Sequence, residues 1–300
     1  MSKIVAWAQW PDLKVPDSVT LHSNQDMPLE TSDLSSINFY VPSYMGGKAA
    51  LEFVTKMPNL TTLQVPNAGY DDALAYLRPG LTLCNASGVH DASTAELAVA
   101  LALASRRGFP TFASDQAKGK WNQQRFKSLS DSKIGIIGFG SIGKQVAKNL
   151  SGFEVEVIGF SKSGRDGSKK IEELDAYLPI LDIVILILPL NVESRNMFNA
   201  ERLAKMKDGS LLVNVARGPI VNTDALIKEL NSGRLNAALD VTDPEPLPQD
   251  HPLWSAKNVL IVPHVGGFTP AFEPRARKLV EAQLALLASG GELKNIVARG

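Results

Sequence analysis

Short apolar runs alternate with segments of helical periodicity along most of this 300-residue chain. In the first third of the chain a helix is expected over 47–57, and strands are expected at 3–8, 37–42, 61–66 and 81–86. From residue 133 onward the alternation is strict, and it predicts six further strands at 134–137, 155–160, 183–188, 211–215, 236–240 and 259–262. Because strands that alternate with helices assemble into parallel sheets, the pattern predicts an α/β fold with two doubly wound parallel-sheet domains.

The apolar run that begins at Lys133 continues directly into a Gly-x-Gly-x-x-Gly sequence, 138–143. The residues after it predict a helix with Val146, Ala147 and Leu150 on its apolar side. In this strand–turn–helix context the first glycine permits a tight turn, the second lets the backbone approach a pyrophosphate, and the third lets helix and strand pack closely. The motif therefore predicts a dinucleotide site, the alternative being a purely structural turn.

The residues after the second strand of this domain indicate which dinucleotide is bound. A protein that prefers NAD places Asp or Glu about 20 residues after the glycines, where the acid holds the ribose 2′-hydroxyl. Here the segment reads Ser161-Lys162-Ser163-Gly164-Arg165, whose hydroxyls and cations suit a 2′-phosphate. We therefore expect NADP, with NAD as the alternative because Asp166 follows directly. The alternative to a 2′-phosphate site is that 161–165 form a solvated turn that is basic without a functional role.

Two further segments suggest how the domains divide. Residues 94–106 are apolar nearly all round, so this helix is expected to be buried between two domains or between two subunits. A polar segment, 114–132, links it to the glycine motif, and a final helix over 269–288 is expected to return to the first domain. The expected division is a substrate-binding domain, 1–92 with 271–300, and a larger Rossmann dinucleotide-binding domain, 93–270. A small ligand is expected in the cleft between them.

Composition narrows the class of partner. The chain has 31 basic and 31 acidic residues, so it carries no charge excess that would favour nucleic acid or an anionic membrane. The single cysteine, Cys84, excludes an intramolecular disulfide and a cysteine-based metal site, and its apolar neighbours predict a buried thiol. The first residues lack the features of a signal peptide, and the longest uncharged apolar run, 183–190, is too short to cross a bilayer. We therefore expect a cytoplasmic protein without a metal.

Polar residues follow three predicted strands of the second domain, where open α/β sheets bind their ligands. Arg217 follows the fourth strand of that domain, and Asp240 ends the fifth. Glu245 lies in the proline-rich loop after the fifth strand, and His264 follows the sixth. Taken singly, each of Arg217, Glu245 and His264 is more often a surface or structural residue than a functional one. Together they supply a cation for a carboxylate, a proton donor near neutral pH, and an acid that favours the imidazolium.

These residues lie within blocks that resemble the D-isomer-specific 2-hydroxyacid dehydrogenases. The resemblance covers about residues 60–285, and its order and spacing make it specific. The blocks are NAGYDD, CNASGVHDASTAELAVALALA, GKW, IGIIGFGSIGKQVA, LPLNVESRNMF, MKDGSLLVNVARGPIVNTDAL, ALDVTDPEPLPQDHPLW and VPHVGGFT. Asn191 and Ser194 stand where threonine is more usual, with little effect expected, and Ser161 replaces the acid of NAD-preferring members.

The resemblance implies roles for individual positions. It implies that Arg217 binds the substrate carboxylate and carbonyl, that Glu245 tunes the histidine, and that His264 is the general acid/base. Substrate contacts are further expected from the backbone N–H groups of Asn67, Ala68 and Gly69, and from Tyr44 in a loop expected to face the cleft. The cofactor is expected to contact Gly138, Phe139, Gly140, Ser141, Ile142, Gly143, Ser161, Lys162, Ser163, Arg165, Leu188, Pro189, Val215, Ala216, Asp240, His264 and Gly266.

The expected activity is reduction of a small 2-oxoacid to the D-2-hydroxyacid by NADPH. Glyoxylate and hydroxypyruvate are favoured, followed by a bulkier acid such as phenylpyruvate, because the first domain lacks the cations that a phosphorylated substrate requires. The alternatives are a dehydrogenase of another small anion such as formate or phosphite, an NAD-dependent enzyme of a phosphoglycerate-like substrate, and a dinucleotide-sensing corepressor. Because the family is typically dimeric, a homodimer is expected.

Overall fold

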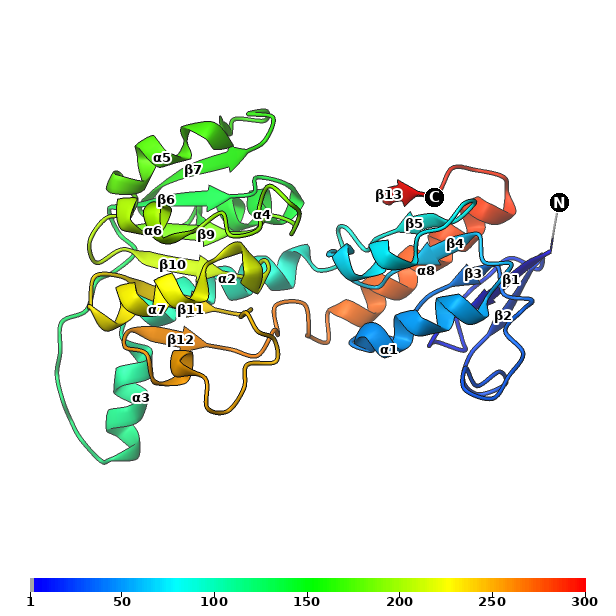
Figure 1. Cartoon of the computed structure of the whole chain (residues 1–300), viewed down its shortest axis with the longest axis horizontal. Helices are drawn as coiled ribbons and strands as arrows, with labels where there is room; N and C mark the ends of the chain where they lie inside the picture. Colours follow the sequence, from blue (N-terminus) through cyan, green and yellow to red (C-terminus); the bar gives the residue numbers. More distant parts are fainter. Residues whose placement is uncertain (1–2) are drawn as a thin grey trace. The chain divides into compact units, whose positions relative to one another are not determined.

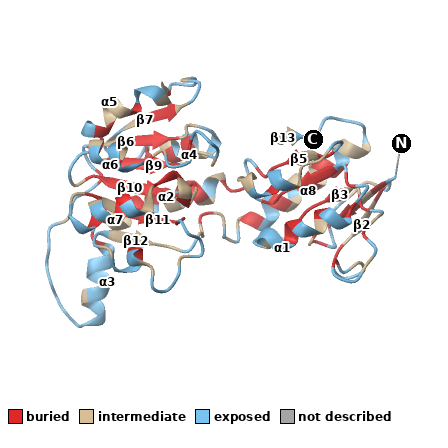
Figure 2. Cartoon of the chain, in the orientation of Figure 1, coloured by how far each residue is buried: buried red, intermediate tan, exposed pale blue. Residues whose placement is uncertain are grey.

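The computed structural model describes residues 3–300, which form two compact units (Figure 1). The first unit comprises 1–90 and 270–300, and the second comprises 91–269. Each unit has a sheet of its own with buried residues on both faces, as the red strands in Figure 2 show. The expected α/β fold with two doubly wound sheets is confirmed.

The first unit is built on a six-stranded sheet in the order β13-β5-β4-β3-β1-β2. All neighbouring strands are parallel except β13, which runs antiparallel to β5. One face packs against α8 around Phe39, and the other packs against α1 around Tyr40. The elements are β1 Ile4–Trp7, β2 Val19–His22, β3 Phe39–Tyr40, α1 Gly47–Glu52, η1 Phe53–Lys56, β4 Thr62–Gln64, η2 Asp71–Tyr76, β5 Thr82–Cys84, α8 Phe272–Ala288 and β13 Ile296–Arg299.

The second unit is built on a seven-stranded, wholly parallel sheet in the order β12-β11-β10-β9-β6-β7-β8. The strand order reverses between β6 and β9, which defines the switch point at which such sheets bind dinucleotides. The strands are β6 Ser132–Ile137, β7 Val155–Ser161, β8 Lys169–Lys170, β9 Ile183–Leu186, β10 Leu211–Asn214, β11 Asn236–Leu239 and β12 Val259–Ile261.

The helices of the second unit cover both faces of this sheet. The apolar helix α2 packs against α4 and over β10 and β11, so it is buried within its own unit. The helices are α2 Asp91–Arg106, α3 Phe109–Ala117, α4 Ser141–Leu150, η3 Ile171–Glu173, α5 Leu174–Tyr177, η4 Leu178–Ile180, α6 Ala200–Lys205, η5 Gly218–Ile220, α7 Thr223–Asn231 and η6 Pro252–Ser255.

Four elements were not expected from the sequence. The edge strands β2, β8 and β13 bury few side chains, so they leave a weak apolar signal. Helix α3 has no buried residue, and its last residues, 114–117, are the first of the expected polar segment. In Figure 1 α3 lies apart from the sheet of the second unit. The expected polar segment, 114–132, therefore begins within α3, which was not predicted because the helix has no packed face from which a period could be recognised.

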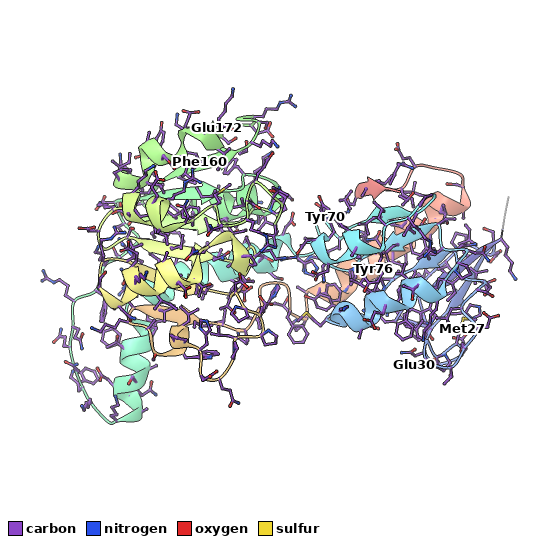
Figure 3. The ribbon with its side chains drawn as sticks, in the orientation of Figure 1. Met27, Glu30, Tyr70, Tyr76, Phe160 and Glu172 are labelled. Atoms are coloured by element: carbon purple, nitrogen blue, oxygen red, sulfur yellow. The ribbon has the colours of Figure 1, made fainter. Side chains whose placement is uncertain are left out.

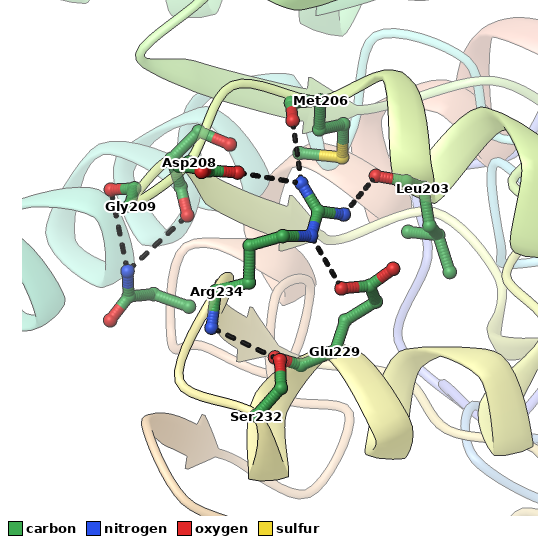
Figure 4. Close-up of polar contacts among 9 residues, drawn as sticks. Leu203, Met206, Asp208, Gly209, Glu229, Ser232 and Arg234 are labelled. Atoms are coloured by element: carbon green, nitrogen blue, oxygen red, sulfur yellow. Dashed lines mark hydrogen bonds and ion pairs between the residues drawn. The ribbon is translucent and has the colours of Figure 1, made fainter.

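Arg234 ties three segments of the second unit together (Figure 4). Its guanidinium donates to Glu229 at 2.6 Å, to the carbonyl of Leu203 at 2.6 Å and to the carbonyl of Met206 at 2.7 Å. The last two carbonyls belong to the end of α6, where helical hydrogen bonds run out. The side chain is 23% exposed, so these bonds form largely away from solvent.

Replacing Arg234 with methionine is expected to lower the free energy of unfolding of the second unit by about 3 kcal/mol, since two carbonyls and one carboxylate lose a charged donor. Denaturant unfolding followed by circular dichroism measures the change. Lys228→Met is the matched control, because Lys228 is exposed on α7 one residue from Glu229 and its side chain forms no hydrogen bond or ion pair within 3–300. Equal midpoints for the two variants would contradict the assignment.

Candidate active site

The loops that follow β10, β11 and β12 form one edge of the second unit's sheet. These three strands are neighbours and parallel, so their carboxyl ends meet at that edge. Arg217 follows β10, Asp240 and Glu245 follow β11, and His264 follows β12. The structure thus brings the polar residues singled out in this unit to one place.

His264 and Glu245 form a hydrogen-bonded pair. The Nδ1 atom of His264 lies 2.5 Å from Oε1 of Glu245, and each side chain is 38% exposed. Since a carboxylate only accepts, Nδ1 is the protonated nitrogen that donates, which leaves Nε2 for another partner. The hydrogen bond raises the pKa of His264 despite burial, which opposes it. Burial acts to raise the pKa of Glu245, but the bond and charge of His264 outweigh it and lower that pKa.

The carboxylate of Asp240 holds the turn that carries His264. Its two oxygens accept the backbone amides of Val265 at 2.6 Å and Gly266 at 3.0 Å. The carbonyl of Asp240 accepts the amide of His264 at 2.8 Å. Asp240 is only 3% exposed, and burial raises its pKa above the usual value although the two amides oppose the shift. The side chain therefore fixes the backbone of 264–266.

Arg217 lies in a loop whose backbone packs directly on the backbone of the loop after β11. A Cβ atom on Gly218 would collide with the backbone at Thr242 and Asp243, so only glycine permits this approach. The Nη1 atom of Arg217 donates to the carbonyl of Ala216 at 2.9 Å. The guanidinium also lies near enough to lower the pKa of both His264 and Glu245. The cation, the acid and the imidazole thus share one electrostatic environment.

Asn214 is a structural partner of this loop that the sequence argument missed. Its side-chain amide donates to the carbonyl of Arg217 at 3.0 Å, and its oxygen accepts the amide of Ala216 at 3.0 Å. It is buried at the end of β10, and a polar residue closing an apolar strand was the available signal. Val215 and Ala216, both expected to contact the cofactor, are buried beside it.

The glycine motif has the geometry that dinucleotide binding requires. Gly138 has a φ of +104°, and a Cβ there would collide with the backbone of Ile187. A Cβ on Gly143 would meet the carbonyl of Gly138, which explains the close packing of α4 on β6. Gly140 precedes α4, has no side-chain cap, and has nothing within 4 Å of a Cβ position. The first amides of α4 are therefore accessible to an anion.

Other residues that are expected to contact the cofactor lie in this turn and in the loop after β9. Ser141 begins α4 and its hydroxyl donates to Asp91, while Ile142 is partly buried against the core. The ring of Phe139 lies over Gly159 of β7. Leu188 and Pro189 follow β9 in the neighbouring loop. A dinucleotide fits the free amides and open space at Gly140.

No acidic residue stands at the end of β7, where a protein that prefers NAD has Asp or Glu. Phe160, labelled in Figure 3, is fully buried, and Ser161 follows it at the end of the strand. The hydroxyl of Ser161 accepts the amide of Gly164 at 3.0 Å, which shapes a tight turn. Ser163 is exposed in this turn.

The cations of this loop differ in their partners. Lys162 forms an ion pair with Glu193 at 2.7 Å. Asp166, in the same loop, forms an ion pair at 2.6 Å with Lys144 of α4. Within 3–300 the structure gives the side chain of Arg165 no hydrogen bond or ion pair. The side chain of Asp166, which was the reason to keep NAD open, is thus held by a lysine of α4.

The residues expected to contact substrate from the first unit lie in two places. Asn67, Ala68 and Gly69 follow β4, immediately before Tyr70, which is labelled with Tyr76 at the two ends of η2 in Figure 3. The ring of Tyr44 stacks on Phe272 with the ring centroids 3.8 Å apart. Their part in substrate binding stays a prediction.

Searches for two kinds of feature gave no example in the part of the chain that the structure describes. Residues 3–300 contain no group of three His, Cys, Asp or Glu side chains placed to hold a metal ion. No helix within the same residues is long and apolar enough to cross a membrane. The thiol of Cys84 is buried, and burial raises its pKa to about 11.

Oxidoreductases that use a nicotinamide dinucleotide are the class of protein to which this fold and site point. Residues 99–266 match the family model described as D-isomer specific 2-hydroxyacid dehydrogenase, NAD binding domain. The chain belongs to this family, and the resemblance of the sequence blocks is confirmed.

Relatives within the family differ in substrate. The chain is 33% identical over 75% of its length, and 73% of the relative's, to glyoxylate/hydroxypyruvate reductase B of Yersinia pestis. It is 30% identical over 84% of its length to D-3-phosphoglycerate dehydrogenase of Methanocaldococcus jannaschii, and spans about half (50%) of that protein. Among solved structures, an NADPH-dependent glyoxylate/hydroxypyruvate reductase from Sinorhizobium meliloti, bound to NADP and sulfate, superposes with a TM-score of 0.83. That pair is 26% identical and covers 99% of this chain and 98% of the other.

Removing the negative charge in Glu245→Gln is expected to lower the pKa of His264, because the hydrogen-bonded carboxylate is the largest cause of its upward shift. An NMR titration of the imidazole resonances measures this directly and requires no substrate. Glu193→Gln is the control, since Glu193 pairs with Lys162 in the same unit. An unchanged His264 titration in Glu245→Gln would contradict the arrangement described above.

Proposed function

We propose that the protein reduces a small 2-oxoacid, such as glyoxylate or hydroxypyruvate, to the D-2-hydroxyacid with NADPH. The observation that carries the proposal is the hydrogen-bonded His264–Glu245 pair beside Arg217 at the carboxyl edge of a dinucleotide-binding sheet. The similarity to a glyoxylate/hydroxypyruvate reductase supports the same substrate class.

The bound cofactor would supply the hydride that reduces the substrate's carbonyl carbon. With Nδ1 held by Glu245, protonated His264 donates from Nε2 to the oxygen that becomes the hydroxyl. Glu245 keeps the imidazolium populated to a higher pH than an ordinary histidine would allow. Arg217 binds and stabilises the negative charge that develops on that oxygen.

NADP rather than NAD is proposed from the loop after β7. Ser161 stands where an acid would repel a 2′-phosphate, and Arg165 has no side-chain partner in the described residues. The side chain of Asp166 is occupied by Lys144. The free cation of Arg165 is thus the group that we assign to the 2′-phosphate.

The other candidate functions have less support. A phosphoglycerate-like substrate is supported by one relative, but this chain matches only half (50%) of that relative's length. A dehydrogenase of formate or phosphite, and a dinucleotide-sensing corepressor, share the fold without a residue here that specifically favours them.

A homodimer and a cytoplasmic location stay predictions. The helix expected at a subunit interface, α2, is packed within its own unit. Apolar side chains are instead exposed on α3 and just after it, at Phe109, Phe112 and Trp121, the last 99% exposed. We propose these three side chains as part of the contact of a homodimer, because large apolar side chains exposed on one segment mark interaction surfaces.

The test of the activity is oxidation of NADPH with glyoxylate, hydroxypyruvate, pyruvate and phenylpyruvate. The wild type is expected to turn over at least one of them, and His264→Gln to lose about 10²–10⁴-fold in kcat with NADPH affinity unchanged. Arg217→Lys is expected to be severely impaired, because an ammonium does not reproduce the planar fork. Full activity in His264→Gln, or no turnover of any of the four acids, would refute the proposal.

The cofactor preference is tested separately. Arg165→Gln is expected to raise the KM for NADPH about tenfold and to leave that for NADH unchanged, since a charge-assisted hydrogen bond contributes about 1.5–3 kcal/mol. Lys148→Gln serves as the control, because it removes an exposed cation of α4 whose side chain forms no hydrogen bond or ion pair in the described residues. Equal effects of Arg165→Gln on both cofactors would overturn the assignment of Arg165.

A further inference from the structure

Three consecutive peptide carbonyls after β4 are held by residues 85–90. The carbonyl of Pro66 accepts Nε2 of His90 at 2.8 Å. The carbonyl of Asn67 accepts the amide of Ala86 at 2.9 Å, and that of Ala68 accepts the side-chain amide of Asn85 at 2.7 Å. Because a carbonyl only accepts, His90 carries its proton on Nε2 here.

These bonds determine where the following amides point. In a trans peptide the C=O and the N–H of the next residue point in opposite directions, and the peptides joining 66–69 are trans. With the three carbonyls directed toward 85–90, the N–H groups of Asn67, Ala68 and Gly69 point away from that segment. None of the three has a hydrogen-bond acceptor within 3–300. Three successive N–H groups without an acceptor in the described residues offer hydrogen bonds to an anion.

The amides are accessible, whereas the side chains that orient them are buried. Asn67 is exposed and Ala68 and Gly69 are half-buried. His90 is 6% exposed and stacks on Phe272 with 5.2 Å between ring centroids and 10° between planes. Asn85 is 8% exposed, and its oxygen accepts the amide of Ser87 at 3.3 Å. Neither side chain can turn to solvent without breaking these contacts. The carbonyls of Pro66 and Ala68 therefore stay fixed.

We propose that Asn85 and His90 are positioning residues that aim the amides of 67–69 at the carboxylate of the 2-oxoacid. This inference rests on the proposed function, since it is the substrate that brings the carboxylate. Neither side chain touches the substrate; each acts through the peptide whose carbonyl it holds. Without its donor, the peptide is free to rotate, and the amide of the next residue loses its direction.

Two pairs of variants separate the hydrogen bond from the packing. His90→Phe retains the ring that stacks on Phe272 and removes the donor, whereas His90→Gln retains a donor and removes the ring. Asn85→Leu removes the donor at nearly constant size, and Asn85→Gln retains it. We expect His90→Phe and Asn85→Leu each to raise the KM for the 2-oxoacid about tenfold, a loss typical of one hydrogen bond to a charged group. The kcat should change less than threefold, and the glutamine variants should recover part of the loss.

Tyr40→Phe is the matched control for lost stability. Its buried hydroxyl donates to the carbonyl of Ala50 at 2.8 Å in the same unit, so it holds no carbonyl of 66–69. It removes one side-chain donor from one backbone carbonyl, as the test variants do, and is expected to leave KM unchanged even where its melting temperature falls.

The dissociation constant of oxalate, measured by calorimetry with NADP present, distinguishes this inference from the proposed function. Weaker oxalate binding by His90→Phe and Asn85→Leu supports the positioning role, even where the wild type turns over no 2-oxoacid and the proposed function falls. Unchanged KM and unchanged oxalate binding in both variants would overturn it, as would a wild type that binds no oxalate. An equal rise of KM in Tyr40→Phe would also overturn it, because the effect would then follow stability alone.

Discussion

The buried carboxylate of Asp240 is the group on which the polar site of the second unit depends. Its oxygens accept the amides of Val265 and Gly266, and its carbonyl accepts the amide of His264. These three bonds join the end of β11 to the turn after β12. They hold His264 at a φ of +52°, a left-handed conformation that costs about 1–3 kcal/mol in a residue other than glycine. The imidazole meets Glu245 because the backbone beneath it is held in this conformation.

The parallel sheet supplies the second constraint. Neighbouring parallel strands deliver their following loops to one edge, but the loops must then pass within contact distance of each other. Two glycines permit this, Gly218 against the backbone at Thr242 and Gly138 against the backbone of Ile187. The loop that carries Arg217 and the glycine motif each depend on a glycine at which any Cβ atom would collide with the backbone of a neighbouring loop.

Much of this arrangement was recognisable in the sequence. The buried strands were found because their apolar runs are bounded by turn residues, and the polar residues after β10, β11 and β12 follow from where such strands end. Asn214, Asn85 and His90 were not recognised as anchors, because a lone polar residue in an apolar stretch does not say which carbonyl or amide it will meet. Helix α3 was missed because none of its residues is buried.

The two units fix their backbones with side chains of opposite hydrogen-bonding character. In the second unit the anchor is an acceptor, Asp240, and it consumes the amides of the turn that it holds. In the first unit the anchors are donors, Asn85 and His90, and they hold carbonyls so that the amides of the same peptides stay free. A carboxylate at either of these positions would be repelled by the carbonyl it had to hold, and would bring negative charge close to free amides that suit an anion. An amide and an imidazole instead hold these carbonyls by donating to them, and they place no carboxylate beside the free amides of 67–69.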